Sequence, residues 1–103
     1  MTFVYLIQLN EKYRTAANWA PQDHTVVAQH FNFLKELYGN GTVSFVGKTG
    51  LSIDHPHNTG IAFFEADSLE SAELLMQQDP AVQAGLMELR VLPFEVILPH
   101  KNQ

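Results

Sequence analysis

The longest periodic pattern in the chain is apolar side chains recurring every three or four residues between Pro21 and Tyr38, which predicts a helix. Pro21 suits the first helical position, where its missing N–H needs no partner, and Gly39-Asn40-Gly41 is typical of a helix end. The apolar side carries Val26, Val27, Phe31, Leu34, Leu37 and Tyr38. His30 falls within this stripe, so we expect it to face the core and to need a hydrogen-bond partner.

Runs rich in β-branched and aromatic residues predict strands on either side of this helix. The predicted strands span Phe3 to Leu9, Thr42 to Lys48, Gly60 to Ala66 and Leu86 to Leu98. A second helix is expected after Asp67 as N-cap, with Glu70 reaching back to it, and should stop before Asp79-Pro80. Pro80 to Gly85 is predicted to form one further turn capped by Asp79. Pro93 indicates an edge position or a bulge in the last strand.

The predicted order β-α-β-β-α-β is the ferredoxin-like arrangement, an α+β fold with a four-stranded antiparallel sheet and both helices on one face. The length of 103 residues suits one domain, with residues 98–103 as a flexible tail. The strand from Phe3 to Leu9 is apolar on both sides, so the second sheet face also needs cover. Since no further helix remains to cover it, we predict a homodimer through the open sheet face.

Composition and charge narrow the classes of partner. The net charge is -5 and the six Lys and Arg residues are scattered, which argues against nucleic acid. Cysteine is absent, so no disulfide or thiol chemistry is expected. No segment approaches the roughly 18 apolar residues of a membrane span. The N-terminal apolar run lacks the basic start and cleavage pattern of a signal peptide. We therefore expect a cytoplasmic protein without a membrane partner.

Three segments carry a more specific pattern. His30-x-x-x-Leu34-x-x-Leu37 leads to Gly41 and the strand TVSFVGK, and later come FFEADSLESAELLMQQDPAVQAGL and LRVLPFEVIL. DPAVQAG at 79–85 and Pro93-Phe94 are the most distinctive parts. Together these segments resemble the YCII-related (YciI-like) family of small, dimeric α+β-barrel proteins. The resemblance implies a site centred on His and Asp, mostly in proteins of unassigned function, with a few relatives linked to lyase-type and dehalogenating steps on aromatic breakdown products.

The resemblance also suggests which residues form that site. The family histidine corresponds to His30, and the aspartate to Asp54 or to Asp79. Asp54 follows the second strand, where the family tends to place an aspartate, whereas Asp79 lies in the Asp-Pro motif. The chain departs from the family pattern in having Gly47-Lys48 where many members have Gly-Pro, and in its short loop before Gly60. The predicted topology independently brings Asp54, Asp79 and the start of the first helix to one rim above His30.

A His/Asp pair permits general acid–base catalysis. The aspartate accepts one ring N–H, and the other ring nitrogen then takes a proton from a hydroxyl or an activated C–H. We predict such a step, of lyase, isomerase or dehalogenase type, on a small aromatic or enolisable molecule, without a cofactor. Arg14 or the N-terminus of the first helix is a candidate to hold an anionic oxygen. The candidate walls for a planar ring are Trp19, Phe31, Phe33, Phe45 and Phe63.

Other interpretations stay open beside this one. The alternative function is a non-catalytic binding or regulatory dimer, in which His30 only hydrogen-bonds a ligand. His30 can also be a core histidine, Asp79 an N-cap, Asp54 a turn residue, and the phenylalanines core side chains. His55-Pro56-His57, with Asp54 and His24 near it in the fold, suggests a metal site. Histidines two apart both bind a metal only on an extended segment, and no four-ligand pattern is visible, so we predict no metal.

Overall fold

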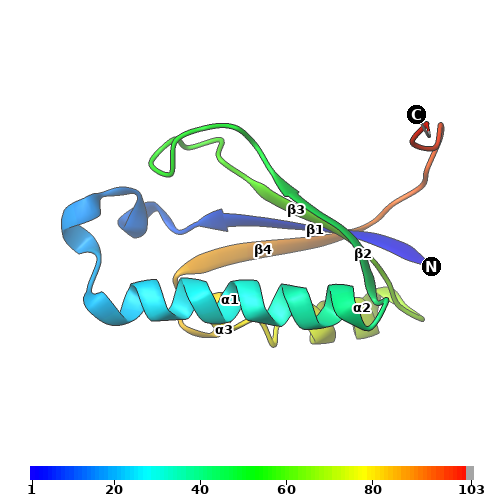
Figure 1. The fold of residues 1–103 in the computed structure, drawn as a ribbon, viewed down its shortest axis with the longest axis horizontal. Coiled ribbons are helices and arrows are strands. Elements are labelled where there is room, and N and C mark those ends of the chain that lie inside the picture. Colours follow the sequence, from blue (N-terminus) through cyan, green and yellow to red (C-terminus); the bar gives the residue numbers. More distant parts are fainter. Residues whose placement is uncertain (102–103) are drawn as a thin grey trace.

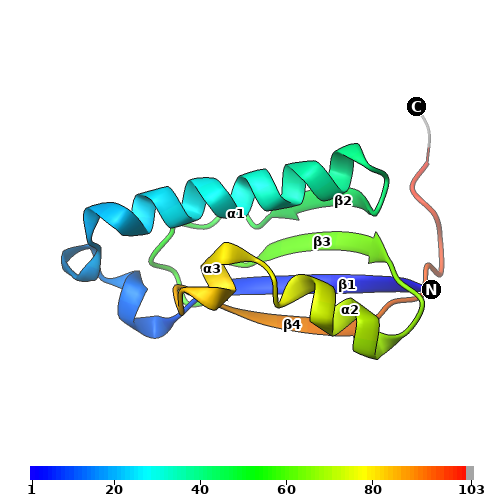
Figure 2. The same cartoon turned by 90° about the horizontal axis from the view of Figure 1, so that it is seen from below.

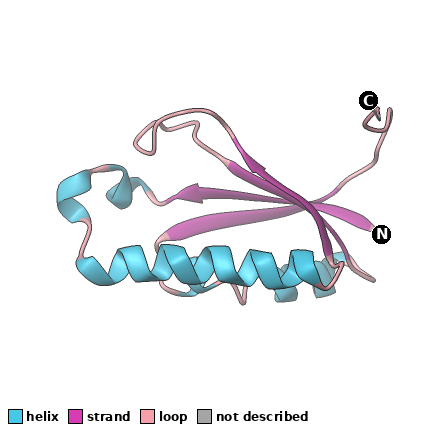
Figure 3. Ribbon diagram, viewed as in Figure 1, coloured by secondary structure: helices cyan, strands magenta, loops and turns pink. Residues whose placement is uncertain are grey.

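All the α-helices of this computed structural model pack on one face of a four-stranded antiparallel sheet, as Figures 1 and 2 show. The structure describes residues 1–101; the end of the predicted flexible tail, 102–103, lies outside the described residues. The elements are β1 (Thr2–Leu9), η1 (Glu11–Arg14), η2 (Ala16–Asn18), α1 (Pro21–Gly39), β2 (Val43–Lys48), β3 (Gly60–Glu65), α2 (Leu69–Met76), α3 (Pro80–Gln83) and β4 (Met87–Pro93), with η marking 3-10 turns. The strand order β2-β3-β1-β4 confirms the ferredoxin-like prediction (Figure 3).

Two predicted boundaries were wrong. Ser68, not Asp67, caps α2, because the Ser71 N–H donates to Ser68 Oγ and the Ser68 N–H donates to Ser71 Oγ, both at 3.1 Å. The last strand ends at Pro93 and not at Leu98. β4 pairs with β1, and the Phe94 N–H donates to the Thr2 carbonyl at the very start of β1. Residues 95–98 therefore have no strand left to pair with.

The core lies between the sheet and the helices. Alternate residues of the two central strands point toward the helices and are buried: Phe3, Tyr5, Ile7, Leu9, Ala62 and Phe64. They pack with Ala72 and Met76 of α2. Burying a large apolar side chain contributes about 1.5–3 kcal/mol, so this layer fixes α1 and α2 on the sheet.

A β-bulge in β2 reverses the side on which its residues lie. Val43 pairs with Phe64 on the core side, but Phe45 pairs with Phe63 on the opposite side. The bulge adds one residue to the strand, so Val46 instead of Phe45 turns toward α1. Regular alternation along the predicted strand would place Val43 and Phe45 on the same side, and the bulge separates them.

The other face of the sheet has no helix over it (Figure 1). The C-terminal segment covers part of this open face, with the ring of Phe94 4.6 Å from that of Phe63 between centroids. Other large apolar side chains there stay exposed, among them Phe45 at 50% and Leu92 at 45%. This open face is defined below by Phe45, Phe63, Leu92 and Phe94.

Candidate active site

Three side chains from distant parts of the chain meet beneath α1. His30 Nδ1 lies 2.6 Å from Asp79 Oδ2. The hydroxyl of Tyr5 donates to the same oxygen atom at 2.5 Å. His30, Asp79 and Tyr5 are only 5%, 0% and 1% exposed, respectively, so water competes little for these hydrogen bonds. Helix α1, strand β1 and the turn before α3 thus each supply one member of the cluster.

Asp79 is held in place by its role as a helix cap. Its Oδ1 accepts from the Ala81 N–H at 2.9 Å at the start of α3, and Pro80 occupies the first helical position, where no N–H is needed. Both carboxylate oxygens therefore have donors. The N-cap interpretation and the histidine-partner interpretation of Asp79 apply together, since the cap uses one oxygen and His30 the other.

The protonation of the cluster follows from its partners. Burial above all, and then the charge and hydrogen bond of Asp79, raise the pKa of Tyr5 far above its usual value, so Tyr5 is a neutral donor. An ionised carboxylate can only accept hydrogen bonds. Nδ1 of His30 must therefore carry the proton that Asp79 accepts. In the neutral form of the ring Nε2 then keeps a free lone pair, and this is the form that can act as a base.

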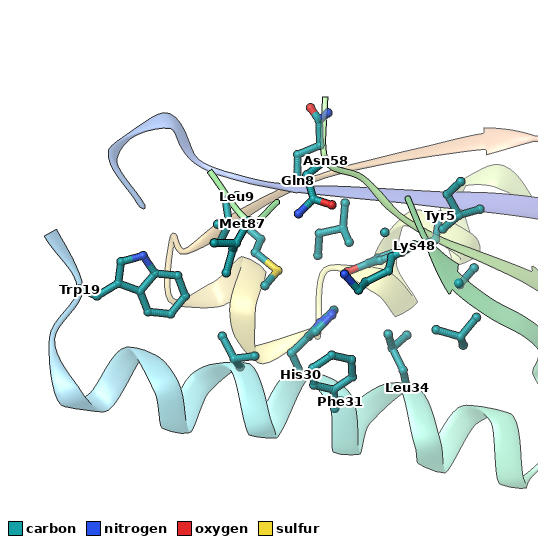
Figure 4. Close-up of a pocket in the computed structure, with 18 residues that line it drawn as sticks. Tyr5, Gln8, Leu9, Trp19, His30, Phe31, Leu34, Lys48, Asn58 and Met87 are labelled. Atoms are coloured by element: carbon teal, nitrogen blue, oxygen red, sulfur yellow. The ribbon is translucent and has the colours of Figure 1, made fainter. Parts of the chain in front are cut away.

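A cavity of about 420 Å³ adjoins His30 between α1 and the sheet. Figure 4 shows the His30 ring rising from α1 into this space, with Phe31 and Leu34 beside it. The apolar lining includes Ile7, Leu9, Trp19, Val27, Phe31, Leu34, Val46, Ile53, Ile61, Ala62 and Met87. Its polar lining side chains, apart from His30 and the Tyr5 hydroxyl, are Gln8, Lys48 and Asn58. A mostly apolar cavity with a few polar groups is typical of small-molecule sites.

The structure brings one of the two candidate aspartates to His30. Asp79 contacts the ring, whereas Asp54 is exposed in the loop between β2 and β3. Within residues 1–101, no hydrogen bond or ion pair joins Asp54 to His30. The catalytic role of either residue stays a prediction.

The predicted substrate-binding residues do not lie together: Phe31 lines the cavity, whereas Phe63 packs against Phe94 on the open face. Trp19 lines the cavity, and its Nε1 donates to the Tyr13 carbonyl at 2.6 Å. Phe33 packs against the core instead, and Phe45 lies on the open face because of the bulge. Arg14 is not among the residues that line the cavity. Their binding of substrate also stays a prediction, with Trp19 in a position suited to it.

Two site residues were not identified from the sequence. Tyr5 lies within the predicted strand from Phe3 to Leu9 and was not singled out there, although a hydroxyl among core phenylalanines signals a buried partner. Lys48 was noted only as a departure from the Gly-Pro pattern, and nothing in the sequence showed that it would face the cavity. The positions of both residues in the site depend on contacts between segments that are far apart in the sequence, so only the structure shows them.

The histidines of the loop between β2 and β3 form a local turn. His55 Nδ1 accepts from the His57 N–H at 3.0 Å. Among residues 1–101, no three His, Asp or Glu side chains lie close enough together to hold a metal ion. In the same part of the chain, no helix has the length and apolar character needed to cross a membrane.

Comparison with known proteins identifies a family that the sequence matches and a solved structure with a similar fold. The family model of the YCII-related domain matches residues 1–95. A solved structure with the same fold is 5-chloro-2-hydroxyhydroquinone dehydrochlorinase from Burkholderia phenoliruptrix AC1100, in complex with 2,5-dihydroxybenzoquinone. The two chains are 18% identical, with a TM-score of 0.66 over 92% of this chain and 94% of the other. No curated protein matches the sequence.

Proposed function

Since the chain belongs to the YCII-related family, we propose that it is an enzyme in which His30 removes a proton from a small aromatic or enolisable substrate. The observation that carries this proposal is the 2.6 Å contact between His30 Nδ1 and Asp79 Oδ2. It directs the free Nε2 of a buried histidine toward an apolar cavity. Such a base, oriented by a carboxylate, contributes roughly 10²–10⁴-fold to the rate of a proton transfer.

The proposed step uses each member of the cluster. Nε2 of His30 takes the proton of a substrate C–H or O–H bond, and the electron pair of that bond stays on the substrate. Asp79 stabilises the imidazolium that forms, and Tyr5 holds the Asp79 carboxylate in place. In a lyase-type reaction the electron pair then forms a double bond and expels a leaving group with its own pair. The proton on His30 returns to solvent or to the product.

The similar fold of the dehydrochlorinase supports an aromatic or quinone-like substrate class. That protein is named for its action on a chlorinated hydroxyhydroquinone and was solved with a dihydroxybenzoquinone. A single six-membered ring fits a cavity of about 420 Å³. Trp19 and Phe31 offer aromatic surface to such a ring. A dehalogenating elimination is therefore one form of the proposed reaction.

The assembly belongs to the same proposal. Two chains would join through the open face, which exposes Phe45 at 50%, Leu92 at 45% and Phe94 at 37%. Contiguous apolar surface of this kind is typical of an interface between proteins. In the ferredoxin-like fold, pairing two such sheets produces a dimeric α+β barrel.

The test compares wild-type protein with His30→Ala on a panel of substituted hydroquinones, hydroxyquinones and enolisable acids. We expect turnover of at least one compound and a loss of about 10²-fold or more in His30→Ala. His57→Ala is the matched control, because His57 is exposed and is not among the residues that line the cavity. Retained turnover in His30→Ala would overturn the proposal. Binding of these compounds without any conversion would favour the non-catalytic module instead.

A further inference from the structure

Lys48, the last residue of β2, brings a positive charge to the cavity that contains His30 (Figure 4). It is the one Lys, Arg, Asp or Glu among the described residues that line this space. Within residues 1–101, its ammonium group forms no salt bridge. The Asp79 carboxylate beneath the cavity is already occupied by Tyr5, His30 and Ala81. The cavity thus has a permanent cation without a matching anion.

Two residues with amide side chains, Gln8 and Asn58, are among those that line the cavity. Gln8 Nε2 donates to Thr59 Oγ1 at 3.0 Å, which ties the loop between β2 and β3 to β1. Asn58 Oδ1 accepts from Thr49 Oγ1 at 3.0 Å. Asn58 is one of the residues that line the cavity, and within the described residues its Nδ2 donates no hydrogen bond. Donors without an acceptor indicate a ligand that supplies oxygen atoms.

We propose that Lys48 is the subsite for an anionic oxygen, so that the substrates are planar acids carrying a carboxylate or a phenolate or enolate oxygen. This inference rests on the proposed function and names its substrate class. A charge pair at the edge of an apolar cavity is stronger than the same pair in water. Lys48 is exposed, so its ammonium group stays hydrated until the anion arrives.

The position of Lys48 also matches the direction in which electrons move. When His30 Nε2 takes a proton from a carbon or hydroxyl conjugated with the anionic group, the freed electron pair is delocalised toward that group. The negative charge near Lys48 increases by part of one unit and the proton is on His30, so the step balances without an oxidant or reductant. A cation facing that group stabilises the product of proton removal more than the substrate.

The experiment measures binding by calorimetry with three ring compounds of similar size: 4-hydroxybenzoate, 4-nitrophenolate and neutral 4-hydroxybenzamide. The proteins are wild type, Lys48→Gln, Lys48→Arg and Lys35→Gln. Lys35→Gln removes the same charge from an exposed position of α1 that does not line this cavity. The two anions distinguish a carboxylate subsite from a phenolate subsite, and the amide reports on ring binding alone.

We expect wild-type protein to bind one or both anions more tightly than the amide. Lys48→Gln should weaken anion binding by about 10- to 100-fold, as expected for a charge-assisted contact, and leave amide binding unchanged. Lys48→Arg should retain most of the preference, and Lys35→Gln all of it. The inference is overturned if wild-type protein shows no preference for an anion. It is also overturned if Lys48→Gln binds all three compounds like wild type, or if Lys35→Gln causes the same loss.

These outcomes separate the two proposals because binding does not require turnover. Loss of turnover in His30→Ala with no anion preference would overturn the Lys48 subsite and retain the base. If the anion preference depends on Lys48 but the His30→Ala variant stays active, the base is overturned and the Lys48 subsite is retained.

Discussion

His30 Nδ1 and Asp79 Oδ2 are 2.6 Å apart, and the same aspartate begins α3 by accepting the Ala81 N–H on its other oxygen. The residue that orients the histidine is therefore itself oriented by the backbone. A side chain tied to a helix start and to Tyr5 has little freedom to rotate. The ring of His30 consequently faces the cavity in one orientation, which is the pre-organisation that the proposed role as a general base requires.

Asp79→Asn should abolish the basic form of His30 while preserving the fold. The amide oxygen keeps the Ala81 N–H, so the amide NH₂ is directed toward His30 Nδ1. The ring can accept from this NH₂ only by moving its proton to Nε2, which removes the lone pair needed for catalysis. We expect kcat to fall roughly 10²–10⁴-fold. KM should change little, since Asp79 does not line the cavity.

Asp54→Asn is the matched control for that measurement. Asp54 carries the same carboxylate in an exposed loop, so its replacement should leave kcat near the wild-type value. The opposite pattern, with Asp54→Asn inactive and Asp79→Asn active, would identify Asp54 as the partner in catalysis. Circular dichroism should show the same helix and strand content in both variants.

Tyr5→Phe should lower the free energy of unfolding by about 1–3 kcal/mol at neutral pH, because it removes one donor from a buried carboxylate. The pKa of Tyr5 is raised in the folded protein, so the folded state keeps its proton after the unfolded chain has lost it. This contribution is complete below about pH 10. Above that pH it declines by about 1.4 kcal/mol per pH unit. Urea unfolding at neutral and alkaline pH measures both effects.

The stability gap between wild type and Tyr5→Phe should therefore shrink as the pH rises above about 10. Tyr38→Phe serves as the control, since Tyr38 is 60% exposed on α1 and should give neither effect. Equal free energies of unfolding for wild type and Tyr5→Phe at neutral pH would show that the Tyr5 hydroxyl does not support Asp79. A gap that stays constant at high pH would contradict the raised pKa of Tyr5.

Much of the fold could be predicted because its signals are local. The apolar periodicity identified α1 to within one residue at its end, and the pair Asp79-Pro80 correctly predicted the cap of α3. The cap of α2 was misplaced because Asp67 and Ser68 are both good capping residues. Only the hydrogen bonds of the folded chain, in which Ser68 and Ser71 cap each other through their hydroxyl groups, decide between them.

The site was less predictable because it depends on contacts across the chain. His30 could be identified, since a polar residue in an apolar stripe needs a partner. The choice of Asp79 over Asp54 as that partner depends on how the turn after α2 meets α1. The positions of Phe45 and Lys48 depend on the bulge in β2, which shifts every later residue of the strand to the opposite side. A single extra residue of this kind leaves no mark in the hydrophobic pattern.

Leu92→Asp should dissociate the proposed homodimer. Leu92 lies on the open face and is 45% exposed, so a charge there leaves the folded chain intact but must be desolvated when two sheets meet. A two-fold interface contains the residue twice, which makes the expected cost about 3–6 kcal/mol, or roughly 10²–10⁴-fold in the dissociation constant. Sedimentation velocity over a range of concentrations measures this dissociation constant.

Leu74→Asp, on the exposed side of α2 at 57%, is the control and should leave the assembly unchanged. A wild-type monomer, or equal dissociation in both variants, would disprove association through the open face.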